Sequence, residues 1–202
     1  MARKKSELLS SLGTVFEIVK AIIDEVLDLG GSDEDVRRIL KDKSLRKKIA
    51  NLIVQTKPAI QDTFKVVVDY GQSLAEMISA GKYGWVNSDI IQKHFPVEGS
   101  DQKEVELVLF HFGRVMTSEQ VIAEMDEAGY RPAPIEDLLS LGASYPELQK
   151  DFPVAALGSV WQSPVGHRYV PYLPWCGVRR DLNLYWFGPD WPESYRFAAV
   201  RK

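Results

Sequence analysis

The sequence predicts an α+β protein in two parts, a helical N-terminal segment of residues 1–60 and an α+β domain of residues 61–202. Two observations support this division. In the first part, apolar side chains recur every three or four residues, as they do along one face of a helix. In the second part, short β-branched and aromatic runs bounded by proline and glycine alternate with helical segments, which is typical of a mixed fold.

The N-terminal segment is predicted to form three helices. The first covers residues 7–29 and ends at Gly30, because glycine commonly follows the last turn of a helix. Ser32 precedes acidic residues and is expected to cap a short second helix. Ser44 begins a third helix, which Pro58 stops. Three helices in so short a segment form a small bundle or a partner-binding arm, so we expect oligomerisation or docking there.

The second part is predicted to begin with a strand over residues 64–69 and a short helix over 73–80. Residues 105–112 are apolar on both faces, which indicates a central strand. One helix follows from Ser118, and another begins at Pro134, since proline suits the first turn of a helix. The closing strands are expected to form an antiparallel run, over residues 154–161, 167–173, 181–187 and 195–201.

Composition and charge narrow the classes of partner. The chain has 202 residues, of which 45% are hydrophobic, so it can bury a core. A net charge of -3 argues against a protein that wraps nucleic acid. Cys176 is the one cysteine, so no intrachain disulfide can form. No signal peptide and no membrane-spanning run are recognised, so we expect a cytoplasmic protein that does not bind membranes.

Three motifs resemble one branch of the C-type lectin fold. Residues 129–138, Gly-Tyr-Arg-Pro-Ala-Pro-Ile-Glu-Asp-Leu, resemble its helix entry, with Pro132-Ala133 in place of Leu-Pro. Residues 158–161 resemble its Trp-bearing strand, and residues 195–201 its terminal strand. Formylglycine-generating enzymes and the variable proteins of diversity-generating retroelements share this branch. The resemblance covers residues 100–202 and implies a C-type-lectin-like domain with a strand, two helices and antiparallel strands.

The likeness to retroelement variable proteins implies a binding region that differs between copies, over residues 157–202. In such proteins template asparagine codons are randomised at adenines, which yields residues such as Asn, Tyr, Ser, Pro and Cys but leaves tryptophan fixed. The alternative is that these are ordinary loop residues. The candidate variable positions are Pro171, Pro174, Cys176, Asn183, Tyr185, Pro189, Pro192, Ser194 and Tyr195.

The last part of the chain is rich in aromatic residues, with four of the five tryptophans after residue 160. Tyrosine and tryptophan give a large contact area at low entropic cost, so they are favoured in binding surfaces. Strand alternation over 181–187 places Trp186 on one face with two leucines, and Asn183 and Tyr185 on the other. We therefore expect Trp161 and Trp186 in the core, and Asn183 and Tyr185 exposed. The alternative is that the aromatic residues are all core.

Residues for catalysis or metal binding are not recognised. Formylglycine-generating enzymes bind copper with a pair of cysteines, and only Cys176 is present here. His94, His111 and His167 lack metal-ligand spacing. Calcium-dependent sugar binding is not expected either, since the Glu-Pro-Asn and Trp-Asn-Asp signatures are absent. We expect neither an enzyme nor a metal or cofactor.

The predicted function is therefore ligand recognition without catalysis, through an aromatic surface. In addition to the candidate variable positions, this surface is expected to include Tyr169, Trp175 and Trp191. We expect the ligand to be a protein in preference to a small molecule or a sugar, and we do not expect nucleic acid. One alternative is a nucleic-acid or protein adaptor that uses the basic stretch 37–48, with a merely structural C-terminal domain. Another is an enzyme of the formylglycine branch with altered chemistry.

Overall fold

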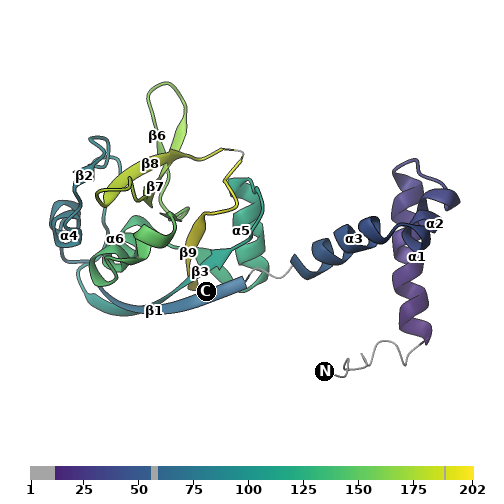
Figure 1. The fold of residues 1–202 in the computed structure, drawn as a ribbon. Helices are drawn as coiled ribbons and strands as arrows, with labels where there is room; N and C mark the ends of the chain where they lie inside the picture. Colours follow the sequence, from purple (N-terminus) through teal and green to yellow (C-terminus); the bar gives the residue numbers. More distant parts are fainter. Residues whose placement is uncertain (1–11, 56–58, 189) are drawn as a thin grey trace. The chain divides into compact units, whose positions relative to one another are not determined.

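The computed structural model describes residues 12–55, 59–188 and 190–202 (Figure 1). The chain divides into two compact units, Met1–Thr56 and Lys57–Lys202, close to the predicted boundary at residue 60. Helices and a mixed sheet are both present, so the α+β class is confirmed.

The N-terminal unit consists of α1 (Leu12–Asp28), α2 (Asp33–Lys41) and α3 (Lys43–Gln55). Gly30 follows α1 with a φ of 80°, a left-handed conformation that favours glycine. Ser32 caps α2, since its backbone N–H and hydroxyl donate to Asp35 at 3.0 and 2.8 Å. These hydrogen bonds lower the pKa of Asp35. Arg46 of α3 donates to two carbonyls at the end of α2, those of Ile39 and Leu40, at 2.8 and 2.7 Å, and so holds α3 against α2.

The second unit is built on one mixed sheet, in the order β1-β3-β9-β5-β7-β8-β2. Two short strands lie off this path, because β4 pairs with β9 and β6 pairs with β7. The strands are β1 (Ala59–Asp69), β2 (Trp85–Val86), β3 (Gln102–His111), β4 (Tyr130–Pro132), β5 (Val154–Ala155), β6 (Trp161–Gln162), β7 (Arg168–Leu173), β8 (Asp181–Trp186) and β9 (Arg196–Arg201).

The predicted antiparallel run at the end of the chain is only partly correct. β7 and β8 form an antiparallel hairpin. β9, however, leaves the hairpin and lies between β3, to which it is antiparallel, and β5, to which it is parallel. The predicted strand over 154–161 is also split into β5 and β6. The chain turns between them because Gly158 donates its N–H to the carbonyl of Ala133 at 3.0 Å. A Cβ at Gly158 would lie 2.6 Å from that oxygen, so only glycine fits.

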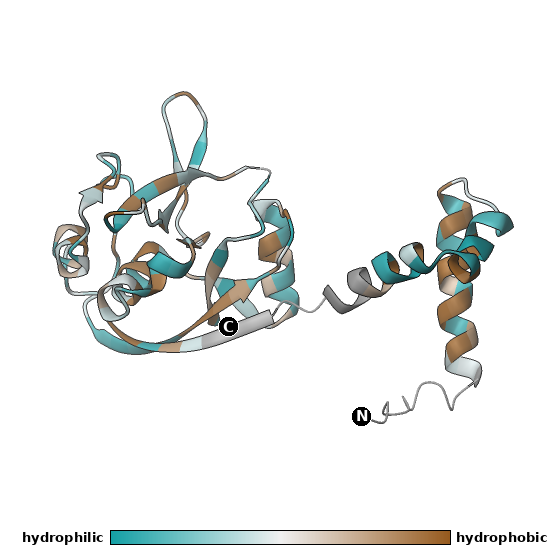
Figure 2. Ribbon diagram, in the orientation of Figure 1, coloured by the Kyte–Doolittle hydropathy of each residue, from teal (hydrophilic) through white to brown (hydrophobic). Residues whose placement is uncertain are grey.

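Helices cover both faces of the sheet, as the two-sided apolar pattern of β3 requires. Leu107 and Leu109 of β3 belong to the first core, which includes residues of α4 (Leu74–Gly81) and α6 (Ile135–Ser144). Val108 and Phe110 belong to the second core, under α5 (Ser118–Glu127). A short α7 (Leu148–Asp151) precedes β5. Figure 2 shows hydrophobic residues on α5 and α6. The predicted central strand is thus confirmed, with a separate core on each side.

Two tryptophans lie opposite to their predicted positions. Trp191 was expected at the surface but is only 1% exposed, because it lies in the second core against Phe197. Trp186 was expected in the core but is 55% exposed. It is the last residue of β8, beyond the part of the hairpin that the first core covers, and its nearest aromatic neighbour is His167 at 5.7 Å.

These two positions provide a matched pair of substitutions. We expect Trp191→Ala to lower the free energy of unfolding by about 3–5 kcal/mol, because it leaves a large cavity. Trp186→Ala should cost less than about 1 kcal/mol, since it removes an exposed side chain. Urea unfolding of both variants measures this. The reverse order of the two losses would contradict the placement of both side chains.

Candidate functional site

The loop that follows β8 is held on the beginning of α5 by Trp191. The Trp191 N–H donates to the carbonyl of Met116 at 2.8 Å, and the Met116 N–H donates back at 3.3 Å. Inside the core, the indole Nε1–H donates to the hydroxyl of Ser118 at 2.8 Å. Ser118 in turn donates its backbone N–H to Gly188 at 3.4 Å. Both ends of the loop segment 188–191 are therefore fixed to one short stretch of chain.

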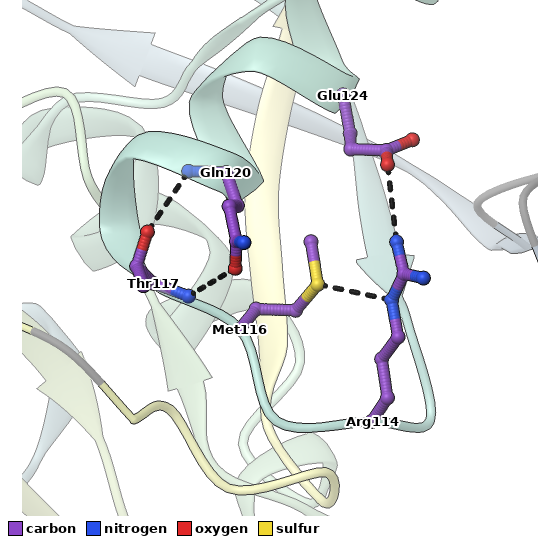
Figure 3. A network of polar contacts seen from close by, with 5 residues as sticks. All are labelled: Arg114, Met116, Thr117, Gln120 and Glu124. Carbon is purple, nitrogen blue, oxygen red and sulfur yellow. Dashed lines mark hydrogen bonds and ion pairs between the residues drawn. The ribbon is translucent and has the colours of Figure 1, made fainter. Parts of the chain in front are cut away.

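The beginning of α5 is itself fixed by reciprocal hydrogen bonds (Figure 3). The Thr117 hydroxyl accepts from the Gln120 N–H at 3.2 Å, and the Gln120 side chain accepts from the Thr117 N–H at 2.9 Å. Beside this cap, Arg114 pairs with Glu124 at 3.1 Å and donates to the sulfur of Met116 at 3.1 Å. These contacts fix the segment that contains Met116 and Ser118, the two residues that bind Trp191. The loop therefore has a defined position.

Three half-buried tyrosines lie next to one another, two of them against Trp191, and we call them the tyrosine cluster: Tyr172 of β7, Tyr185 of β8 and Tyr195 of the loop before β9. Their ring centroids lie 5.4–6.0 Å apart. Tyr185 and Tyr195 lie 4.6 and 5.2 Å from the ring of Trp191. Burial raises the pKa of Tyr172 and Tyr195, so these hydroxyls stay protonated and can donate or accept. The cluster thus presents aromatic area with neutral polar ends.

Asn183 lies beside the tyrosine cluster, opposite Tyr172 in the β7–β8 hairpin. Its side-chain oxygen accepts from Asn87 at 2.9 Å and from the Leu184 N–H at 2.7 Å. Asn183 and Tyr185 were expected to be exposed, and both are half-buried. The reason is that the second core extends under this face of the hairpin, through Trp191.

The structure brings together only part of the predicted site. Asn183, Tyr185 and Tyr195 lie at the tyrosine cluster. Pro192 and Ser194 are exposed in the adjoining loop, where the Pro192 carbonyl accepts from the Tyr195 N–H at 3.1 Å. These five residues and Tyr172 form the candidate surface. Tyr172 was not among the predicted site residues, although alternation along β7 opposite Asn183 places it on this face.

The other predicted residues lie elsewhere. Tyr169 points to the opposite face of the hairpin, where its ring lies 5.7 Å from that of Trp161, a residue packed against the first core. Pro174, Trp175 and Cys176 belong to the connection between β7 and β8, at the end of the hairpin away from Trp186.

Two further predicted site residues, Pro171 and Pro189, are not part of the candidate surface. Pro171 is buried in β7, so it cannot contact a ligand. Its missing N–H falls between the segments paired with β5 and β6, where no ladder partner is required, while its carbonyl accepts from Ala156 at 3.0 Å. Pro189 lies outside the described residues.

A recess of about 370 Å³ lies at the end of β8 and was not expected. Exposed Trp186 lines it with His167, and Arg168 lies over the ring of Phe187 at 4.3 Å. Arg168 also pairs with Glu119 at 3.3 Å, an exposed ion pair that contributes little to stability. Because Trp186 was expected in the core and is instead exposed, its sequence position did not indicate this recess.

The chemistry of the candidate surface is that of contact and hydrogen bonding. Its side chains are phenol, amide, hydroxyl and proline groups. In the part of the chain that the structure describes, no group of three or more His, Cys, Asp or Glu side chains could hold a metal ion.

Two buried carboxylates, Glu136 and Asp137, lie away from this surface, in the first turn of α6. Asp137 is 1% exposed and accepts from the Tyr70 hydroxyl at 3.2 Å. Burial raises the pKa of Asp137 to about 6 and also raises that of Glu136. Burial, together with the same contact, raises the pKa of Tyr70 to about 12. Glu136 and Asp137 each have a buried carboxylate oxygen without a hydrogen-bond partner.

This placement predicts how stability depends on pH. The folded state holds the Asp137 proton more tightly than the unfolded state, so the contribution of Asp137 to stability is fully present below about pH 4 and is lost as the pH rises through about 6. Asp137→Asn should remove its part of the decline and raise the free energy of unfolding at pH 8 by about 2–3 kcal/mol. Urea unfolding from pH 4 to about 8 measures this. Glu127→Gln, at an exposed position of α5, is the control. An equal pH dependence in wild type and Asp137→Asn would contradict the burial of this carboxylate.

Comparisons with known proteins identified no relative of this chain. No protein-family model, no curated protein and no solved structure matches this chain. Among the described residues, no helix is both long enough and apolar enough to cross a membrane.

Proposed function

We propose that this chain is a non-enzymatic recognition protein that binds a protein ligand through the tyrosine cluster and the adjoining residues Asn183, Pro192 and Ser194. One observation carries the proposal: half-exposed aromatic rings rest on a buried tryptophan that hydrogen bonds hold in place. Rigid aromatic side chains on a fixed support lose little entropy on binding, which is the property that binding surfaces require.

We propose further that the second unit is a C-type-lectin-like domain of the retroelement variable type. In support, residues that adenine randomisation produces, Asn183, Tyr185, Pro192, Ser194 and Tyr195, lie on the hairpin and loop that form the candidate surface. Trp191, which that process does not produce, lies beneath them as part of the core. Contact residues and supporting residues are therefore different, so the first can change while the fold is kept.

The adaptor alternative has less support. Several basic residues of stretch 37–48 are used within the N-terminal unit. Lys41 pairs with Glu34 at 3.1 Å, Arg38 pairs with Asp35 at 3.5 Å, and Arg46 holds the end of α2. These contacts leave fewer cations for phosphate groups.

The retroelement proposal makes a genetic prediction. Copies of this gene from separate isolates of the source should differ mainly at the codons for Asn183, Tyr185, Pro192, Ser194 and Tyr195. Met116, Ser118 and Trp191 should be constant, because they hold the loop. Sequencing of the copies measures this, and differences spread evenly over the chain would contradict it.

The binding proposal is tested with a display library. The full chain is displayed on phage with positions 183, 185, 192, 194 and 195 randomised, and the library is selected on hen lysozyme as a fixed protein probe. We expect binders from this library. A matched library randomises five exposed positions on β1 and β3, namely Lys65, Val67, Lys103, Glu104 and Glu106. Equal numbers of binders from both libraries, or none from the first, would argue against a specialised surface.

A further inference from the structure

The helix α1 carries an apolar stripe that the rest of the N-terminal unit covers only in part. Apolar residues occupy roughly half of the circumference of α1, more than a helix in a small bundle needs to bury. Val15, Ile23 and Val26, along the middle of the stripe, are half-buried. The exposed apolar residues on its flanks and centre are Phe16, Ile18, Val19, Ile22 and Leu27, and Phe16 is 66% exposed.

Between α1 and α2 lies a mainly apolar groove of about 280 Å³, lined by Val19, Ile22, Val36, Ile39 and Leu40 together with Arg37. Leu40, at its rim, is 80% exposed. Figure 2 shows hydrophobic residues along most of α1, with hydrophilic residues in α2 and α3. An exposed groove of this kind marks an interaction site, because water solvates it poorly.

The charges of the N-terminal unit indicate what covers the groove. Helix α1 has four acidic residues and one lysine, so it is acidic. Residues 33–55 have seven basic and four acidic residues, so α2 and α3 together are basic. The acidic α1 of one copy is therefore complementary in charge to the basic α2–α3 region of a second copy. Two copies related by a two-fold axis would satisfy both contacts at once, since such an interface pairs α1 with α3 in both directions.

Other occupants fit this pattern less well. A helix that lies on an anionic membrane has basic residues along its polar face, whereas the polar face of α1 is acidic. Nucleic acid would contact the cations of α3 but leave the apolar groove exposed.

We infer that the N-terminal unit binds a second copy of this chain, with the acidic, apolar α1 of each copy against the basic α2–α3 region of the other. The inference depends only on the N-terminal unit and goes beyond the proposed function of the second unit. A dimer of this kind displays two candidate surfaces, and a ligand with two epitopes would be held more tightly through both.

Sedimentation equilibrium of the full chain tests the inference. Wild type should sediment as a species of twice 22.8 kDa at micromolar concentrations. The double variant Ile22→Glu/Leu40→Glu should raise the dimer dissociation constant about 100-fold, because it places charges in the apolar contact. Val178→Glu introduces the same charge at an exposed apolar position of the second unit and should dimerise as wild type does. Far-UV circular dichroism confirms that each variant keeps its helices.

A charge exchange identifies the partner as a second copy. Lys47→Glu/Lys48→Glu and Asp24→Lys/Glu25→Lys should each be monomeric alone, because like charges meet at both contacts. An equimolar mixture of the two should form a heterodimer, because both contacts regain opposite charges. A wild type that is monomeric at all concentrations, or a mixture that does not associate, overturns the inference. Sedimentation of a monomeric wild type with anionic vesicles, or its salt-sensitive retention of DNA, would assign the groove to a membrane or to nucleic acid instead.

Discussion

The hydrogen bond from the buried indole of Trp191 to Ser118 is the interaction on which the geometry of the candidate surface depends. A tryptophan in a dry core needs a partner for its N–H, and the first turn of α5 supplies one. The same contact brings the loop after β8 over the second core and into register with Met116. Without it, the Trp191 ring that Tyr185 and Tyr195 contact would not be held in place, and the hairpin and loop would not form one surface.

The position of β9 in the middle of the sheet has a comparable effect on the whole domain. Because β9 pairs with both β3 and β5, the end of the chain links the long strands β1 and β3 to the β7–β8 hairpin. Alternate residues of β3 and β9 enter two different cores, so each face of the sheet is held by its own helices. The candidate surface therefore lies at the margin of a structure whose stability comes mainly from elsewhere. This arrangement allows surface residues to change at a small cost.

Much of the architecture follows from local patterns. Helical periodicity predicted α1, α2, α3 and α6, and the two-sided apolar run predicted β3 as a central strand. Capping and glycine signals at Ser32 and Gly30 predicted where helices begin and end, because they depend on hydrogen bonds within a few residues. The split between β5 and β6 was missed, since it depends on the approach of Ala133 to Gly158 from another part of the chain.

The sequence by itself determined the two-part α+β organisation and the concentration of aromatic residues after residue 160, because these follow from periodicity and composition. Only the tertiary structure decided which tryptophan is buried. Alternation along β8 separates Trp186 from Tyr185, but it cannot say how far each core extends under the hairpin. That extent is set by α5 and by the loop through Trp191, which are distant in sequence, so contacts between remote segments select the residues that meet solvent.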